Sequence, residues 1–278
     1  MLASARPRRF EFKPAVVLTS FARKILLQRH LIFNFVVRDL KSRYVGSLMG
    51  IFWSLIHPLV LLASYTFVFS VVFDMTRFAA TDHFALFLFC GILPWLYFQD
   101  TVIRSCTSVV DQNHLIRKTL FPSEILPVTI VLSNLVTHLI GLTILLLALF
   151  YYGLLGPSAL MIPIYWLLLM LFSLGLGWLA AALQVFLRDT AHVLSVLMVF
   201  WFWFTPIFYK IEAVPDRFRF WIELNPLGHV VEGYRRLLLE NQIFQPLSLA
   251  LLAFISVLVF LVGGWVFRRT KREFVDVL

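Results

Sequence analysis

Residues 31–73 read LIFNFVVRDLKSRYVGSLMGIFWSLIHPLVLLASYTFVFSVVF. The first part of this stretch is basic, but the thirty residues from Tyr44 to Phe73 contain no Asp, Glu, Lys or Arg. About 20 helical residues are enough to cross the hydrocarbon core of a bilayer. The apolar part therefore predicts a membrane-spanning helix with length to spare.

The residues just before this span predict an amphipathic helix. Apolar side chains recur there at i, i+3, i+4, i+7 and i+11, a spacing that lines one face of a helix. A helix with one apolar and one cationic face is expected to lie in the headgroup layer, and the alternative is a helix packed on a partner protein. The apolar face consists of Phe33, Val36, Val37, Leu40 and Tyr44, and the polar face of Asn34, Arg38, Lys41 and Ser42.

The composition of the whole chain predicts an all-α polytopic membrane protein. Of its 278 residues 60% are hydrophobic and only 14% are charged, and the mean hydropathy is +0.87. A soluble globule of this size could not cover its surface with so few charges. The net charge of +9 comes from basic residues beside apolar stretches, which favours anionic headgroups over nucleic acid as the partner.

Six apolar stretches predict six spans within a membrane domain of residues 31–267. A basic segment, 1–30, precedes this domain and a basic tail, 268–278, follows it. Six spans put both termini on one side, and assigning that side as cytoplasmic places seventeen Lys and Arg inside and six outside, which agrees with the positive-inside rule. The spans are expected at about 47–73, 84–110, 125–152, 159–187, 191–208 and 247–267.

The search for catalytic signatures is negative. The sequence contains no GxxxxGK[ST], so it has no P-loop for ATP, and no HExxH, GxSxG or Cys/His cluster with metal spacing. We therefore expect no catalytic, cofactor-binding or metal-binding residue. His57 and His138 are interpreted as hydrogen-bonded packing residues, and Cys90 and Cys106, sixteen residues apart in one apolar segment, are too distant on a helix to form a disulfide.

A pair of opposite charges lies inside the second predicted span. Asp100 and Arg104 are spaced i, i+4, and a charge within lipid usually faces its partner or a water-filled cavity. Two interpretations follow: Asp100 and Arg104 form a structural ion pair, or they line a transport pathway.

Aromatic side chains gather toward the predicted outer half of the spans. One interpretation is an interfacial belt combined with helix packing. The other is a pathway lined with rings, since Tyr and Trp offer sugars both an apolar face and a hydrogen-bonding edge. The candidates for lining a channel are Tyr65, Phe69, Trp95, Tyr97, Phe98, Trp201, Trp203, Phe204 and Tyr209.

The stretch from Lys210 to Glu240 is apolar for a connecting loop. Its basic and acidic residues balance, and its apolar residues include Phe218, Trp221 and Tyr234. The pattern predicts short amphipathic helices that dip into the outer leaflet. One of them is expected at about 227–239, because proline is favoured in the first turn of a helix.

Four segments in order resemble the permeases of type-2 ATP-binding-cassette (ABC) exporters. The resemblance is to the branch that exports O-antigen, capsule or teichoic-acid polymers, and it covers the chain except for about the first twenty-five residues. The segments are RDLKSRY (38–44) followed by GSLMG (46–50), Trp53 and His57-Pro58; FPSEILP (121–127); FLRDT (186–190); and NPLGHVVEGYRR (225–236).

This resemblance implies a half-transporter of a bacterial cytoplasmic (inner) membrane. Two copies of the chain would pair with two copies of a separate ATPase, which binds ATP and Mg²⁺, and would pass a lipid-linked polysaccharide through a channel between them. The resemblance further implies an interface helix at about 31–44 (Arg38, Asp39, Lys41, Arg43, Tyr44), a coupling helix at about 112–121 (Asn113, His114, Leu115, Arg117, Lys118, Phe121) and outer gate helices at about 214–240 (Phe218, Trp221, Tyr234, Arg235).

Other functions remain as alternatives. Within transport, the rival is a permease that exports a small drug or lipid. An intramembrane acyl- or glycosyltransferase would need a cluster of carboxylates or histidines on one membrane face, which the sequence lacks, and a structural scaffold would not need a basic coupling loop. Arg38 and Arg43 could contact the diphosphate of a lipid carrier or ordinary anionic lipid.

Overall fold

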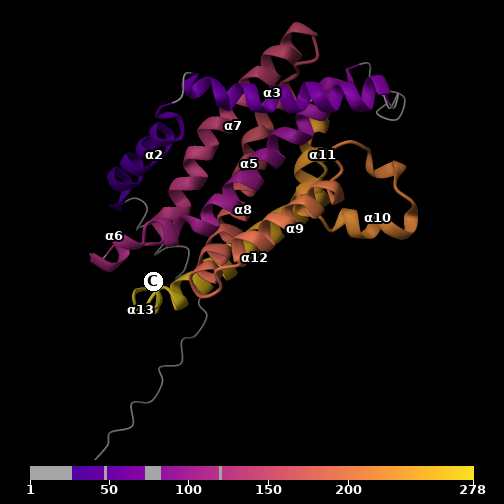
Figure 1. Ribbon diagram of the computed structural model, residues 1–278. Coiled ribbons are helices and arrows are strands. Elements are labelled where there is room, and N and C mark those ends of the chain that lie inside the picture. Colours follow the sequence, from indigo (N-terminus) through magenta and orange to yellow (C-terminus); the bar gives the residue numbers. More distant parts are fainter. Residues whose placement is uncertain (1–26, 47–48, 73–82, 119–120) are drawn as a thin grey trace, which may run out of the picture.

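The computed structural model describes residues 27–46, 49–72, 83–118 and 121–278, and most of the expected basic segment 1–30 lies outside them. Within the described residues every regular element is helical (Figure 1), which confirms the all-α prediction. The elements are α2 (Arg29–Tyr44), η1 (Gly50–Phe52), α3 (Trp53–Thr66), the π-helical η2 (Phe67–Val72), α5 (Phe84–Asp111), α6 (Asn113–Lys118), α7 (Ile125–Tyr151), η3 (Pro157–Met161), α8 (Ile162–Phe186), α9 (Thr190–Phe204), η4 (Ile211–Ala213), α10 (Asp216–Glu223), α11 (Pro226–Leu238), α12 (Pro246–Thr270) and α13 (Phe274–Val277).

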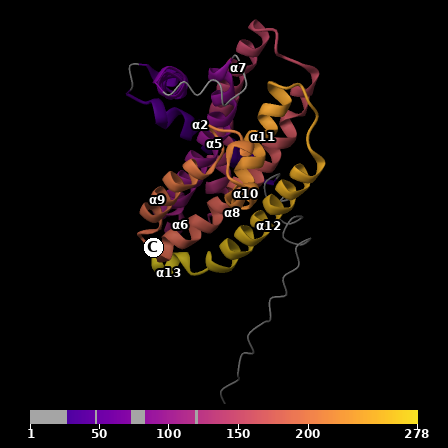
Figure 2. The ribbon, with the colours of Figure 1, turned by 90° about the vertical axis from the view of Figure 1, so that its right-hand side faces the viewer.

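Four helices among the described residues are long and apolar enough to cross a membrane. They are α5, α7, α8 together with η3, and α12. All four run side by side as a tilted bundle (Figures 1 and 2). Their bounds fall close to the second, third, fourth and sixth predicted spans, because long apolar runs leave little choice of register.

The first and fifth predicted spans are shorter helices here. Leu55–Phe69 and Thr190–Phe204 are apolar, but fifteen residues rise only about 22 Å, less than the roughly 30 Å of a bilayer core. The α-helical part of the first gives way to the π-helical turn η2, and the second ends before Pro206, which cannot donate a backbone hydrogen bond. Moreover, α3 lies across the bundle rather than along it (Figures 1 and 2). Six spans are therefore not established by the helix lengths.

The centre of the bundle is α5, whose side chains are buried along most of its length. It packs on α7 and α8, and α8 packs closely on α12. At that last crossing, Gly263 approaches Gly175 so closely that a Cβ on Gly263 would lie 2.0 Å from the Gly175 carbonyl oxygen. Small residues allow membrane helices to approach backbone to backbone, so these two glycines fix the spacing between α8 and α12.

The face that α2 presents to the bundle does not coincide with the predicted apolar face. Phe33, on the predicted apolar face, is 66% exposed, whereas Ile32 is buried. Asp39 and Arg43 turn toward the bundle because α5 and α7 offer them polar partners. The apolar periodicity alone could not reveal this, since it treats every charge as a residue that faces outward.

The predicted helix at 227–239 is α11, which begins one residue earlier. Pro226 stands in its first turn, and the side chain of Asn225 accepts a hydrogen bond from the Leu227 amide at 3.1 Å, a standard N-terminal cap. Most of α11 is buried, because α5, α8 and α12 pack around it. In contrast, α10 is mostly exposed.

The last residues, expected as a basic tail, are folded. Helix α12 continues to Thr270, and the short helix α13 follows it. Phe274 in α13 is fully buried in a cluster with residues of α8 and α12. The cations of this segment predicted a basic tail, and the burial of Phe274 was not predicted.

Candidate functional site

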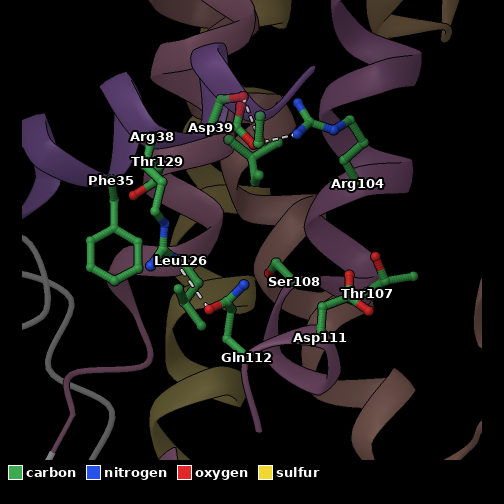
Figure 3. Close-up of a pocket in the computed structure, with 12 residues that line it drawn as sticks. Phe35, Arg38, Asp39, Arg104, Thr107, Ser108, Asp111, Gln112, Leu126 and Thr129 are labelled. Carbon is green, nitrogen blue, oxygen red and sulfur yellow. Dashed lines mark hydrogen bonds and ion pairs between the residues drawn. The ribbon is translucent and has the colours of Figure 1, made fainter. Parts of the chain in front are cut away.

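A polar junction joins α2 to the two spans beside it. We use this name for Asp39 and Arg43 of α2, Asp100 and Arg104 of α5, and Asn134 of α7. Arg43 donates from Nε and Nη2 to Asp39 Oδ2 at 3.1 and 2.8 Å, and Arg104 donates to the other oxygen, Asp39 Oδ1. Figure 3 shows the side chains of Asp39 and Arg104 pointing at each other from different helices.

The amide of Asn134 completes the polar junction. Its Oδ1 accepts hydrogen bonds from Arg43 and, at 3.1 Å, from Arg104. Its Nδ2 donates to the Thr101 hydroxyl at 3.0 Å. Asn134 is buried, and a buried amide is tolerated only when its donors and acceptors find partners. The two arginines and two aspartates are balanced in charge, which lowers the cost of keeping them in an apolar setting.

The sequence predicted that Arg104 pairs with Asp100, but in the structure Asp39 lies nearer to Arg104 than Asp100 does. Asp100 Oδ2 lies 3.9 Å from Arg104 Nη1 and 3.8 Å from Arg43 Nη1, and its side chain is half exposed. Arg104 instead holds Asp39, sixty-five residues away in the chain. Sequence reasoning missed Asn134 and assigned Asp39 only to the interface helix. The available signal was the polar Asn134 within a long uncharged stretch.

A cavity of about 180 Å³ lies between α2, the end of α5 and the start of α7. Its lining includes both signs of charge and several hydroxyl groups, and Figure 3 draws the lining residues as sticks. The lining residues are Phe35, Arg38, Asp39, Ser42, Arg104, Thr107, Ser108, Asp111, Gln112, Leu126, Thr129 and Ile130.

The same cavity marks where α2 touches the predicted coupling segment. Arg38 Nη2 donates to Gln112 Oε1 at 3.2 Å, directly before α6. The Phe35 ring lies 5.5 Å from that of Phe121, after α6, and the Arg38 guanidinium lies 4.2 Å above Phe35. Contacts on both sides of α6 therefore join the two segments that the resemblance assigns to the ATPase interface.

Helix α6 carries most of the predicted coupling residues. Asn113 and His114 are exposed and Leu115 is partly buried, while Ile116, which the prediction did not include, is buried. The side chains of Arg117 and Lys118 lie outside the described part of the structure, as do residues 119–120. In the predicted interface helix, Lys41 is exposed, and the side chain of Tyr44 lies outside the described part of the structure.

Three of the aromatic channel candidates share a second cavity. Tyr65 of α3, Trp95 of α5 and Trp203 of α9 line a space of about 270 Å³. Phe202 and Gln99 line it too, and neither was predicted. Gln99 Oε1 accepts from Trp95 Nε1 at 2.7 Å, so a polar edge meets the aromatic surface here.

The remaining aromatic candidates lie elsewhere. Phe98 and Tyr97 are buried inside the bundle; Phe98 packs on Trp201 at 5.2 Å between centroids and Tyr97 on His138 at 5.3 Å. Phe69 stacks on Phe208 at 4.6 Å, Phe204 stacks on Phe200 at 5.8 Å, and the Tyr209 hydroxyl is 3.4 Å from the Trp203 carbonyl oxygen.

The four predicted gate residues fall into two environments. Phe218 and Trp221 on α10 are exposed, whereas Tyr234 and Arg235 on α11 are buried. The Tyr234 hydroxyl and His138 Nε2 are 2.9 Å apart. Arg235 donates to the carbonyl oxygens of Pro206 at 2.7 Å and Ile207 at 2.6 Å. Its guanidinium also lies 3.5 Å from the centre of the Phe87 ring, so Arg235 fastens α11 to the turn after α9.

Histidines and other metal-ligating side chains give no sign of a metal centre. Across the described ranges, no group of three or more His, Cys, Asp or Glu side chains is placed to hold a metal ion. His138 is buried and bonded to Tyr234, as expected of a packing residue, while His57 is exposed.

Comparison with known proteins places this geometry in context. Residues 30–239 match the family described as ABC-2 type transporter. The chain is 29% identical over 258 residues to the O-antigen export system permease protein RfbA of Myxococcus xanthus, covering 91% of this chain and 97% of that protein. It is 27% identical over 243 residues to RfbA of Klebsiella pneumoniae, with 87% and 92% covered. Identity to the polysialic acid transport protein KpsM of Escherichia coli is 23% over 243 residues, with 85% and 92% covered.

Proposed function

Because the chain belongs to the ABC-2 type transporter family, we propose that it is the permease subunit of an ABC exporter that moves a lipid-linked polysaccharide across the membrane. The observation that carries this proposal is the match along nearly the full length of relatives named for O-antigen export and polysialic acid transport. The substrate class is an O-antigen, capsule or teichoic-acid type of polymer. A permease for a small drug or lipid is the alternative, and none of these relatives carries such a name.

ATP hydrolysis is proposed to occur on a separate ATPase dimer, which binds ATP and Mg²⁺. The lack of a P-loop in the sequence supports this division of labour. The ATPase would dock on α6 and α2. Since Arg38 bonds to Gln112 and Phe35 packs on Phe121, a push on either segment would move the other.

The channel is proposed to form between two copies of the chain in a bacterial cytoplasmic membrane, with six spans per copy and both termini cytoplasmic. The exposed apolar side chains of α3 and α9, such as Val60, Val196 and Phe200, would then face lipid or the second copy. The cavity lined by Tyr65, Trp95, Trp203 and Gln99 would offer sugar rings a stacking surface and a hydrogen-bonding edge.

Deletion of the gene in the source organism tests this proposal. We expect surface polysaccharide to be lost and lipid-linked polymer to accumulate inside the cell, and a plasmid copy should restore the surface polymer only when the ATPase gene is intact. The measurement is polymer extracted separately from intact and from broken cells. Normal surface polymer in the deletion strain would contradict the proposed substrate, and failure of the solubilised chain to retain an ATPase would contradict the proposed partner.

A further inference from the structure

The residues after α12 contact the start of α7, three residues beyond the predicted coupling segment. Lys271, which directly follows α12, places Nζ 2.9 and 3.1 Å from the two carboxylate oxygens of Glu124. Glu124 precedes α7 and is only 3% exposed. The two residues are 147 positions apart in the chain, so this ion pair joins elements that the sequence does not connect.

Glu124 is fastened to α8 as well. Its backbone carbonyl accepts a hydrogen bond from Trp178 Nε1 at 3.1 Å, and the ring of Trp178 packs on Phe260 of α12 at 5.3 Å. The carboxylate of Glu124 also attracts the guanidinium of Arg268. Because a buried carboxylate needs a paired charge, these contacts fix the start of α7, just after the coupling segment.

Helix α13 forms a second contact, with α6 in the coupling segment itself. Its Phe274 is fully buried, 5.4 Å from the Phe267 ring and 6.1 Å from the Phe186 ring. With Phe274 as the anchor, α13 packs against both α6 and α8. Figure 1 shows α6 and α13 at the same end of the bundle.

We propose that Lys271 and Phe274, which we call the C-terminal clasp, are positioning residues that transmit movement of the coupling segment to α8 and α12. This proposal rests on the proposed function. The coupling segment is continuous in the chain only with α5 and α7. The clasp adds two noncovalent connections, from α13 to α6 within the segment and from Lys271 to Glu124 just beyond its end, so a push on the segment would also reach α8 and α12.

The clasp predicts a loss of coupling without a loss of assembly. Inside-out vesicles from the source organism, carrying the full transporter and its own lipid-linked polysaccharide, allow ATP hydrolysis and polymer transfer to be measured together. We expect Lys271→Met and Phe274→Ala to retain the ATPase and to hydrolyse ATP within about twofold of the wild-type rate. Polymer moved per ATP should fall at least tenfold.

Matched variants separate coupling from folding. Lys271→Arg keeps the charge and should restore transfer per ATP to within twofold, and Val275→Ala, on the exposed side of α13, should have no effect. The double variant Glu124→Gln/Lys271→Met removes both charges and leaves no unpaired buried carboxylate, yet it should transfer as poorly as Lys271→Met. Wild-type transfer per ATP in the double variant, or in both single variants, would overturn the proposal. Absence of transfer by the wild-type complex would instead contradict the proposed function.

Discussion

At the scale of single residues, charges within apolar stretches find partners that are distant in the sequence. The need for a partner was predictable for Arg104, because an isolated charge in lipid is costly. Its identity was not, because Asp39 lies sixty-five residues away and the i, i+4 spacing drew attention to Asp100. Arg235 donates to the backbone carbonyl groups of Pro206 and Ile207, which no sequence pattern marks.

Removing one member of the Asp39–Arg104 pair should loosen α2. We expect Asp39→Asn and Arg104→Gln each to lower the free energy of local opening of α2 by about 1–3 kcal/mol, because each leaves a charge without its partner. The double variant should cost less than the sum of the two. Amide hydrogen exchange of α2 measures these free energies.

Asp100→Asn is the control for this pair. Its side chain is half exposed and lies nearly 4 Å from both arginines, so the change should cost less than about 1 kcal/mol. Additive single effects, or an equal effect of Asp100→Asn, would show that Asp39 is not the main partner of Arg104.

Arg235→Lys should destabilise the fold although it keeps the charge. A lysine ammonium lacks the planar fork that reaches the Pro206 and Ile207 carbonyl groups together, and an unbonded buried group costs about 1–3 kcal/mol. Since 1 kcal/mol corresponds to roughly 2–4 °C in a chain of this size, thermal unfolding in detergent should show a drop of several degrees. Arg236→Lys, whose side chain bonds to exposed Gln242, should leave the midpoint nearly unchanged; equal shifts would refute the role of Arg235.

At the scale of elements, the sequence predicted the bounds of the long helices closely, but not the face that α2 turns to the bundle. Long apolar runs determine α5, α7, α8 and α12 because only a helix satisfies its own backbone in lipid. The face of α2 escaped prediction because Asp39 and Arg43 bind inward. The folding of α13 escaped it because the burial of Phe274 depends on α8 and α12 being in place.

The α8–α12 crossing should not tolerate a side chain at Gly263. A Cβ there would lie 2.0 Å from the Gly175 carbonyl oxygen, and overpacking of this kind typically costs roughly 1–3 kcal/mol or more. Gly263→Leu should therefore lower the thermal midpoint and the monodisperse fraction on size-exclusion chromatography. Val262→Ala, at a neighbouring exposed position, should change neither; a normal elution profile for Gly263→Leu would contradict the close approach of the two backbones.

Helix α6 should be required for coupling. Replacing Asn113–Lys118 by a Gly/Ser linker of equal length removes the element that the ATPase would push. We expect polymer export to fall at least tenfold while the cells still make lipid-linked polymer. The same replacement of the exposed pair Glu212-Ala213 should leave export intact. Undiminished export by the α6 variant would refute its assignment as the coupling helix.

At the scale of the whole molecule, one chain leaves large apolar surfaces uncovered. More than half of the side chain is exposed at Val60 of α3 and Phe67 of η2, and also at Val196 and Phe200 of α9. In addition, α3 lies across the bundle (Figure 1). The composition predicted a membrane protein. It could not distinguish the surface that faces lipid from the surface that faces a second copy of the chain. In the proposed two-copy channel, some of these exposed apolar side chains would face lipid and others the second copy.

ATP-dependent transfer of lipid-linked polysaccharide into inside-out vesicles tests the proposed transport most directly. Vesicles that contain both this chain and its ATPase should take up the polymer when ATP is added, and vesicles that lack either protein should not. Equal uptake by vesicles without this chain would contradict the account.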